Sequence, residues 1–140
     1  LNGKDETIDF KIESESKPGE IHDLVDATDY DLIVDNIEKL IYEAINDWKR
    51  GKKYLPRKKV LKAATFHFDG EGLKGALAKS FSEKRSIKIE KAIDDIRKKI
   101  SGYSKDTVTE ESLKTETKRV VARLRNNVLE LKARIKPDIN

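Results

Sequence analysis

The chain has 140 residues and neither cysteine nor methionine, and 40% of its residues are charged against 36% in the apolar set. This length suits a single packed domain. The absence of cysteine excludes a disulfide scaffold, thiolate catalysis and any cysteine-ligated zinc or iron–sulfur site. No apolar run approaches the roughly 18 residues that a membrane-spanning helix needs, so such a helix is excluded as well.

The first residues, LNGKDETIDF, lack the basic-then-apolar order of a signal peptide. We therefore expect an intracellular protein, with no indication of the compartment, although the lack of cysteine fits a mature secreted domain equally well. The chain opens at Leu1 rather than at methionine, which is compatible with a fragment of a longer protein or a processed form.

The N-terminal region has the pattern of an extended arm. Ile8, Phe10 and Ile12 alternate with charged residues, which is the period of a half-buried strand. A single strand has no partner in this chain, so it could add to another chain or stay extended. We divide the chain into an arm and linker over residues 1–19 and a helical domain over residues 20–140, with a short helix expected at residues 20–27.

A continuous apolar stripe predicts a helix that starts after Thr28 or Asp29 and ends before Gly51. Acidic residues crowd its first turn, whereas Lys49 and Arg50 follow its last apolar position, and both arrangements suit the helix dipole. The stripe consists of Ile33, Ile37, Leu40, Ile41, Ala44, Ile45 and Trp48.

Three further helices follow from the same kind of pattern. Pro56 suits the start of the next helix, and the glycine-rich FHFDGEG, residues 66–72, is expected to break it. The helices after it are predicted over residues 73–81 and 86–100.

The last helix is predicted to start after Thr107 or Thr109 and to end at Pro137. Its apolar positions form a heptad pattern, here called the C-terminal seam, which packs either inside its own bundle or against another chain. The seam consists of Thr117, Val121, Leu124, Val128, Leu131 and Ile135. The expected fold class is all-α: a bundle of four or five helices with an extended or β-like N-terminal arm and a long C-terminal helix.

Charge is segregated along the chain. Residues 1–48 hold 4 lysines and 14 acids, a net of −10, whereas residues 49–62 hold 8 basic residues and no acid, a net of +8. Residues 63–140 hold 18 basic residues and 12 acids, a net of +6. Such separation creates opposed electrostatic fields on one molecule.

The basic run of residues 49–62, here called the basic corner, joins a helix C-terminus to a helix N-terminus. Clustered cations bind phosphate backbones because each neutralised phosphate releases condensed counterions, and an exposed tyrosine can stack on a base. No feature indicates base-specific reading. The candidate nucleic-acid-binding residues are Lys49, Arg50, Lys52, Lys53, Tyr54, Arg57, Lys58, Lys59 and Lys62.

The basic corner has other interpretations. It could bind an anionic membrane or an acidic protein, act as a nuclear-localisation-like run, or be neutralised by the acidic segment of the same chain. A basic face of the last helix could extend the contact, or could simply be the solvated side of a bundle helix. That face holds Lys114, Lys118, Arg125, Lys132 and Lys136.

Three weaker patterns accompany the basic corner. A helix-turn-helix could span residues 56–81, but FHFDGEG is longer than the turn that this motif uses. His67, Asp69 and Glu71 could ligate a divalent metal, although a glycine-rich connection explains them as well. Clustered carboxylates could hold magnesium, but helix capping accounts for this set. The carboxylates concerned are Asp23, Asp26, Asp29, Asp31 and Asp35.

The sequence thus favours a non-enzymatic nucleic-acid-binding domain with no catalytic residue, metal or cofactor, and it leaves DNA and RNA undistinguished. The alternative is a protein-interaction or homo-oligomerisation module that uses the C-terminal seam or the N-terminal arm.

Overall fold

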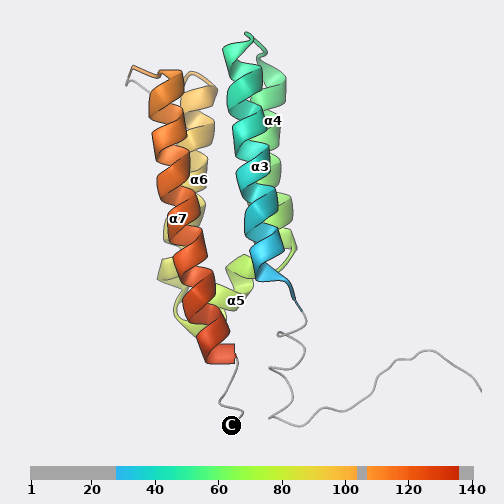
Figure 1. Ribbon diagram of the computed structural model, residues 1–140, viewed down its shortest axis with the longest axis vertical. Coiled ribbons are helices and arrows are strands. Elements are labelled where there is room, and N and C mark those ends of the chain that lie inside the picture. The colour runs from blue at the N-terminus through green and yellow to red at the C-terminus, as the bar shows by residue number, and fades with distance from the viewer. Residues whose placement is uncertain (1–27, 104–106, 136–140) are drawn as a thin grey trace, which may run out of the picture.

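The computed structural model describes residues 28–103 and 107–135, which form five α-helices, one π-helix and no strand (Figure 1). The elements are α3 (Tyr30–Lys49), α4 (Tyr54–Lys62), η2 (Ala63–Gly70), α5 (Leu73–Ser80), α6 (Glu83–Ile100) and α7 (Glu110–Ile135). The predicted all-α bundle with a long C-terminal helix is confirmed. The predicted arm and the helix expected at residues 20–27 lie outside the described residues, and the division into arm and domain stays a prediction.

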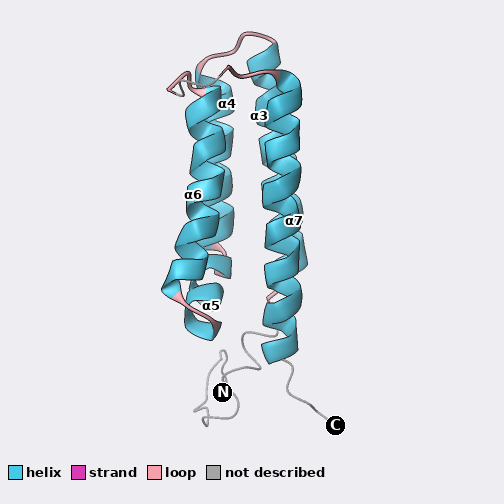
Figure 2. Cartoon of the chain, turned by 90° about the vertical axis from the view of Figure 1, so that its left-hand side faces the viewer, coloured by secondary structure: helices cyan, strands magenta, loops and turns pink. Residues whose placement is uncertain are grey.

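The long helices run antiparallel (Figures 1 and 2). From α3 the chain turns back into α4 and η2, crosses over through the short α5, and returns through α6 and α7. The turn between α3 and α4 and the loop between α6 and α7 therefore meet at one end of the bundle, while α5 lies at the other. Short connections between antiparallel neighbours are typical of helical bundles.

The predicted apolar stripe of α3 forms one side of the core. Ile37, Ile41 and Ile45 are fully buried, and Phe68, Leu73 and Leu77 join them from η2 and α5. Burying this apolar surface is the main force that holds such helices together. None of the described helices combines the length and apolarity needed to cross a membrane.

The C-terminal seam packs into the same core. Thr117, Leu124 and Leu131 are inaccessible to solvent, and Val121 and Val128 are nearly so. Pairing with a second chain through these residues would require the bundle to open. The oligomerisation alternative is therefore left with the N-terminal arm, which lies outside the described residues.

Side-chain caps begin three of the helices, as the sequence chemistry favours. Asp29 accepts a hydrogen bond from the Leu32 backbone N–H at 2.9 Å, which selects it over Thr28 as the cap of α3. Thr109 and Ser112 cap each other's backbone N–H at 3.0 Å, so Thr109 rather than Thr107 begins α7. Ser82 caps α6, which starts at Glu83, three residues earlier than predicted.

The predicted break at residues 66–72 was wrong. The helix that begins at Tyr54 continues as the π-helix η2 through Gly70, and the chain turns only at Glu71 and Gly72, where Gly72 has φ +102°. A Cβ atom at Gly70 would lie 3.1 Å from the Thr65 carbonyl oxygen, so glycine fits the wider π-turn at this position. Pro56 sits in the first turn, where its missing N–H costs no helical hydrogen bond.

Candidate functional site

All four long helical segments meet at the end of the bundle that carries the basic corner (Figure 1). The C-termini of α3 and α6 and the N-termini of α4 and α7 lie there. Within the corner, residues 50–53 connect two antiparallel helices, so their side chains have few neighbours, and Arg50, Lys52, Lys53 and Lys58 are exposed.

Of the eight cations in the basic corner, two are held in ion pairs with described residues. Lys49 Nζ lies 3.3 Å from a carboxylate oxygen of Glu110, and Lys59 Nζ lies 2.7 Å from Asp47. The other six, here called the free cations of the corner, have no ion-pair partner among the described residues. They are Arg50, Lys52, Lys53, Arg57, Lys58 and Lys62.

The Lys59 pair is structural. Asp47 is buried on α3, and its carboxylate forms an ion pair with Lys59 from α4. Lys59 Nζ also lies 3.4 Å from a carboxylate oxygen of Glu43. The hydrogen bond to Asp47, followed by the attraction of both carboxylates, raises the pKa of the Lys59 ammonium above its ordinary value. Lys59 therefore joins α3 to α4 and is not available to an external anion without exposing a buried charge.

Two of the free cations lie over aromatic rings. The Arg57 guanidinium is 5.5 Å from the centre of the Tyr54 ring, and Lys62 Nζ is 5.7 Å from that of Phe66. Such contacts orient a cation without neutralising its charge. The Tyr54 side chain is itself 70% exposed, so its ring stands at the surface among the cations.

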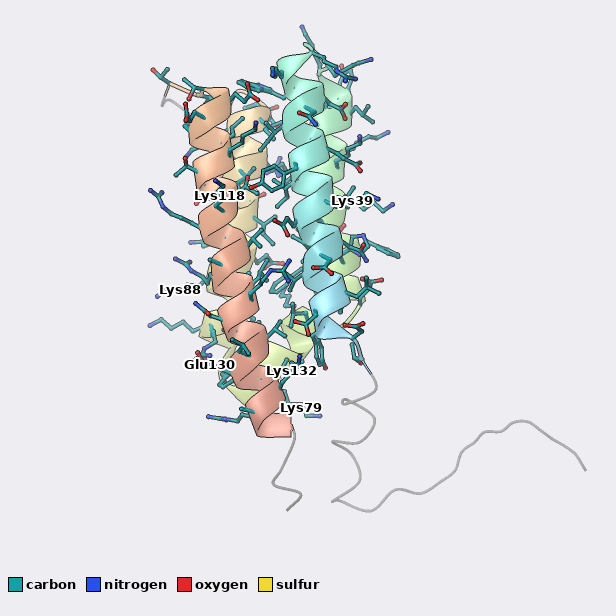
Figure 3. The ribbon with its side chains drawn as sticks, viewed as in Figure 1. Lys39, Lys79, Lys88, Lys118, Glu130 and Lys132 are labelled. Atoms are coloured by element: carbon teal, nitrogen blue, oxygen red, sulfur yellow. The ribbon has the colours of Figure 1, made fainter. Side chains whose placement is uncertain are left out.

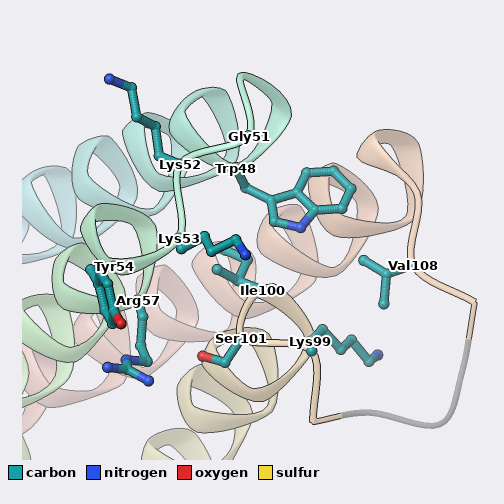
Figure 4. A pocket seen from close by; sticks show the side chains of 11 residues that line it. Trp48, Gly51, Lys52, Lys53, Tyr54, Arg57, Lys99, Ile100, Ser101 and Val108 are labelled. Atoms are coloured by element: carbon teal, nitrogen blue, oxygen red, sulfur yellow. The ribbon is translucent and has the colours of Figure 1, made fainter.

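A pocket of about 670 Å³ opens between the helix ends at this corner (Figure 4). We call it the corner pocket. Trp48 and Val108 line one side, Tyr54 and Arg57 line the other, and Lys53 extends between them. Its lining, as far as the structure describes it, includes no acidic residue. It consists of Trp48, Gly51, Lys52, Lys53, Tyr54, Arg57, Lys99, Ile100, Ser101, Gly102 and Val108.

Sequence patterns did not predict Trp48, Lys99 and Ser101 as members of a site. Trp48 belongs to the apolar stripe, and the other two stand at the end of a helix about 40 residues away from the basic run. Their convergence depends on the antiparallel topology, and no local pattern contains that information. Lys99 is partly neutralised, because its Nζ lies 2.6 Å from a carboxylate oxygen of Glu116.

The acidic residues of α3 are engaged elsewhere in the bundle. Asp35 and Glu38 both bind the Arg125 guanidinium, at 2.8 and 2.9 Å, and Asp31 binds Lys132 at 2.6 Å. Neutralisation of the corner by residues 1–48 is thus limited, among the described residues, to Lys59. The first turn of α7 does bring two acids to this end, Glu110 and Glu111.

These same pairs correct the idea that the basic face of the last helix extends the site. Besides Arg125 and Lys132, Lys114 is also paired, at 3.0 Å from Glu110. Lys118 is the one described member of that set without an ion pair, and it lies on the flank of α7 (Figure 3). Lys136 lies outside the described residues. The described part of this face is therefore largely neutral.

The possible metal-ligand pattern is used for local structure. His67 is buried in η2 and its Nδ1 lies 2.7 Å from Glu71, one turn along the chain. The part of the chain that the structure describes contains no group of three potential ligands that could hold a metal ion.

The aspartate set is divided between capping and ion pairing. Asp29 caps α3, while Asp31 and Asp35 form the ion pairs with α7. Asp23 and Asp26 lie outside the described residues.

The helix-turn-helix interpretation also loses its basis. The turn between η2 and α5 is shorter than the sequence indicated, but α5 lies at the opposite end of the bundle from the basic corner. Its residues Leu73 and Leu77 are fully buried in the core. The helix that would read the major groove is therefore separated from the cations that would contact the phosphate backbone.

No family model, curated protein or solved structure matches this chain.

Proposed function

We propose that this protein is a non-enzymatic nucleic-acid-binding domain whose basic corner contacts the phosphate backbone. The observation that carries the proposal is the set of six cations without ion pairs to described residues, three of them in the turn between α3 and α4 and three along α4. Like charges held this close repel one another, and an external polyanion removes that repulsion while releasing its own counterions.

The distribution of ion pairs supports a polyanion rather than general surface charge. The bundle pairs cations of α7 with the acids of α3, and its buried carboxylate at Asp47 with Lys59. The turn at residues 50–53 has no such partners among the described residues. Solubility requires charge spread over the surface and does not require free cations to be concentrated at one turn.

A salt titration of the wild-type chain tests the proposal. Each backbone contact contributes about −0.7 to −0.9 to the slope of log K against log salt, so six contacts predict a slope of about −4 to −5. Fluorescence anisotropy with labelled oligonucleotides between about 50 and 200 mM salt measures it. Absence of binding at low salt would contradict the proposal, as would equally tight binding to anionic lipid vesicles.

A further inference from the structure

The corner pocket combines aromatic rings with the free cations of the corner. Trp48 is half-buried on one side and Tyr54 is exposed on the other, with Lys53 between them (Figure 4). The pocket is open to solvent and has a volume of about 670 Å³. If the basic corner binds nucleic acid, as proposed above, the shape and chemistry of this pocket bear on which form of nucleic acid it accepts.

The charges of the lining fit an anionic occupant. Lys52, Lys53 and Arg57 line the pocket without ion pairs to described residues, and the described lining holds no carboxylate side chain. The uncapped N-terminus of α4 adds backbone N–H groups beside them, because Lys53 makes no side-chain cap. The C-termini of α3 and α6 carry the negative ends of their helix dipoles, so the side-chain cations supply most of the attraction for an anion.

The aromatic rings fit a flat, unpaired base. Arg57 covers one face of the Tyr54 ring, and the ring's exposure leaves further surface for stacking. Base–aromatic stacking of this kind is sequence-tolerant, because every base has a π-face. The bases of a duplex are already stacked on one another and cannot enter such a pocket without unpairing.

The position of the free cations also favours a single strand over a duplex. Three of them, Arg50, Lys52 and Lys53, lie in the turn at the tip of the bundle, and the other three lie along α4, so no single exposed helix that could enter a major groove carries the whole set. A single strand can bend around such a tip and place both a base and its phosphates against it.

We propose that the corner pocket binds single-stranded nucleic acid, with an unpaired base stacked on the exposed Tyr54 ring, on the side of the pocket opposite Trp48, and the neighbouring phosphates on Lys53 and Arg57. Single-stranded DNA and single-stranded RNA both offer unpaired bases and phosphates, so both are used as probes.

Trp48 is the only tryptophan of the chain, so its fluorescence reports directly on the pocket. The probes are oligothymidylate and oligouridylate of about ten nucleotides, a DNA duplex of the same length, and inorganic polyphosphate. We expect saturable quenching by at least one single strand and tighter binding to it than to the duplex. Polyphosphate is expected to bind with a similar salt dependence but without quenching.

The variant Tyr54→Ala removes one stacking surface and retains every cation. Loss of one stacked base corresponds to about 5- to 150-fold weaker binding of the single strand. The slope against salt and the affinity for polyphosphate should be unchanged. Phe66→Ala is the matched control, since Phe66 is also exposed and also lies under a cation, yet does not line the pocket. We expect the affinity of Phe66→Ala for the single strand to stay within about twofold of the wild-type value.

The outcomes separate the two proposals. Equal, salt-dependent binding of single strand and duplex with no change in Trp48 emission would overturn the pocket assignment and leave backbone binding intact. An equal loss in Tyr54→Ala and Phe66→Ala would also overturn it. Failure of every nucleic acid to bind at low salt would overturn both proposals.

Discussion

The variant Leu124→Asp is expected to unfold the whole helical bundle rather than to separate two folded chains. Leu124 is fully buried in the core of its own chain. An aspartate there leaves a cavity and buries an unpaired charge, which together cost about 5 kcal/mol or more, a large fraction of the stability of a small domain. The milder Leu124→Ala should lower the free energy of unfolding by about 2 to 5 kcal/mol.

Circular dichroism and chemical denaturation measure this effect, and light scattering gives the mass. The control is Leu129→Asp on the same helix, because Leu129 is 65% exposed and its replacement should change stability by about 0.5 kcal/mol or less. A Leu124→Asp chain that stays helical and monomeric while the wild type is dimeric would contradict the internal packing of the C-terminal seam.

Removing four of the free cations from the basic corner is expected to abolish most nucleic-acid binding without unfolding the protein. The variant replaces Arg50, Lys52, Lys53 and Lys58 with alanine and keeps Lys59, whose partner Asp47 is buried. Loss of four phosphate contacts should make the slope of log K against log salt less negative by about 3. It should also weaken binding by about 10²- to 10³-fold near 50 mM salt. The four side chains are exposed, so stability should change little.

A control variant with the same change in net charge distinguishes binding at the basic corner from electrostatic attraction to the protein as a whole. It replaces Lys39, Lys79, Lys88 and Lys118, which are exposed, make no ion pair with described residues and are spread over the bundle (Figure 3). If the basic corner is the site, this variant binds within a few-fold of the wild type at the same ionic strength. Equal losses in the two variants would mean that binding is diffuse and would contradict the assignment.

Much of the fold could be predicted from local chemistry. The stripe from Ile33 to Trp48, with a capping aspartate before it and Gly51 after it, predicts α3 to within a residue at each end. The π-helix could not be predicted in this way, because its hydrogen bonds run over five residues and its apolar positions fit neither helical nor strand periodicity. Phe66 to Gly70 therefore have the composition of a loop while forming the end of a helix.

Charge can be counted from the sequence but not assigned to partners. The ion pairs that Arg125 and Lys132 of α7 form with α3 join residues 87 to 101 positions apart, as in Arg125 with Glu38 and Lys132 with Asp31. They depend on the packing of α7 against α3, which composition does not specify. For the same reason the cations of the basic corner were predictable as a cluster, whereas the contribution of α6 to the corner pocket was not.

Backbone amide NMR of the full chain during an oligonucleotide titration shows where on the bundle the nucleic acid binds. We expect the largest shifts on residues 49–58 and 99–103, with little change over α5 at the opposite end of the bundle. Shifts concentrated on α5 or along the outer faces of α6 and α7, with residues 49–58 unmoved, would contradict binding at the basic corner.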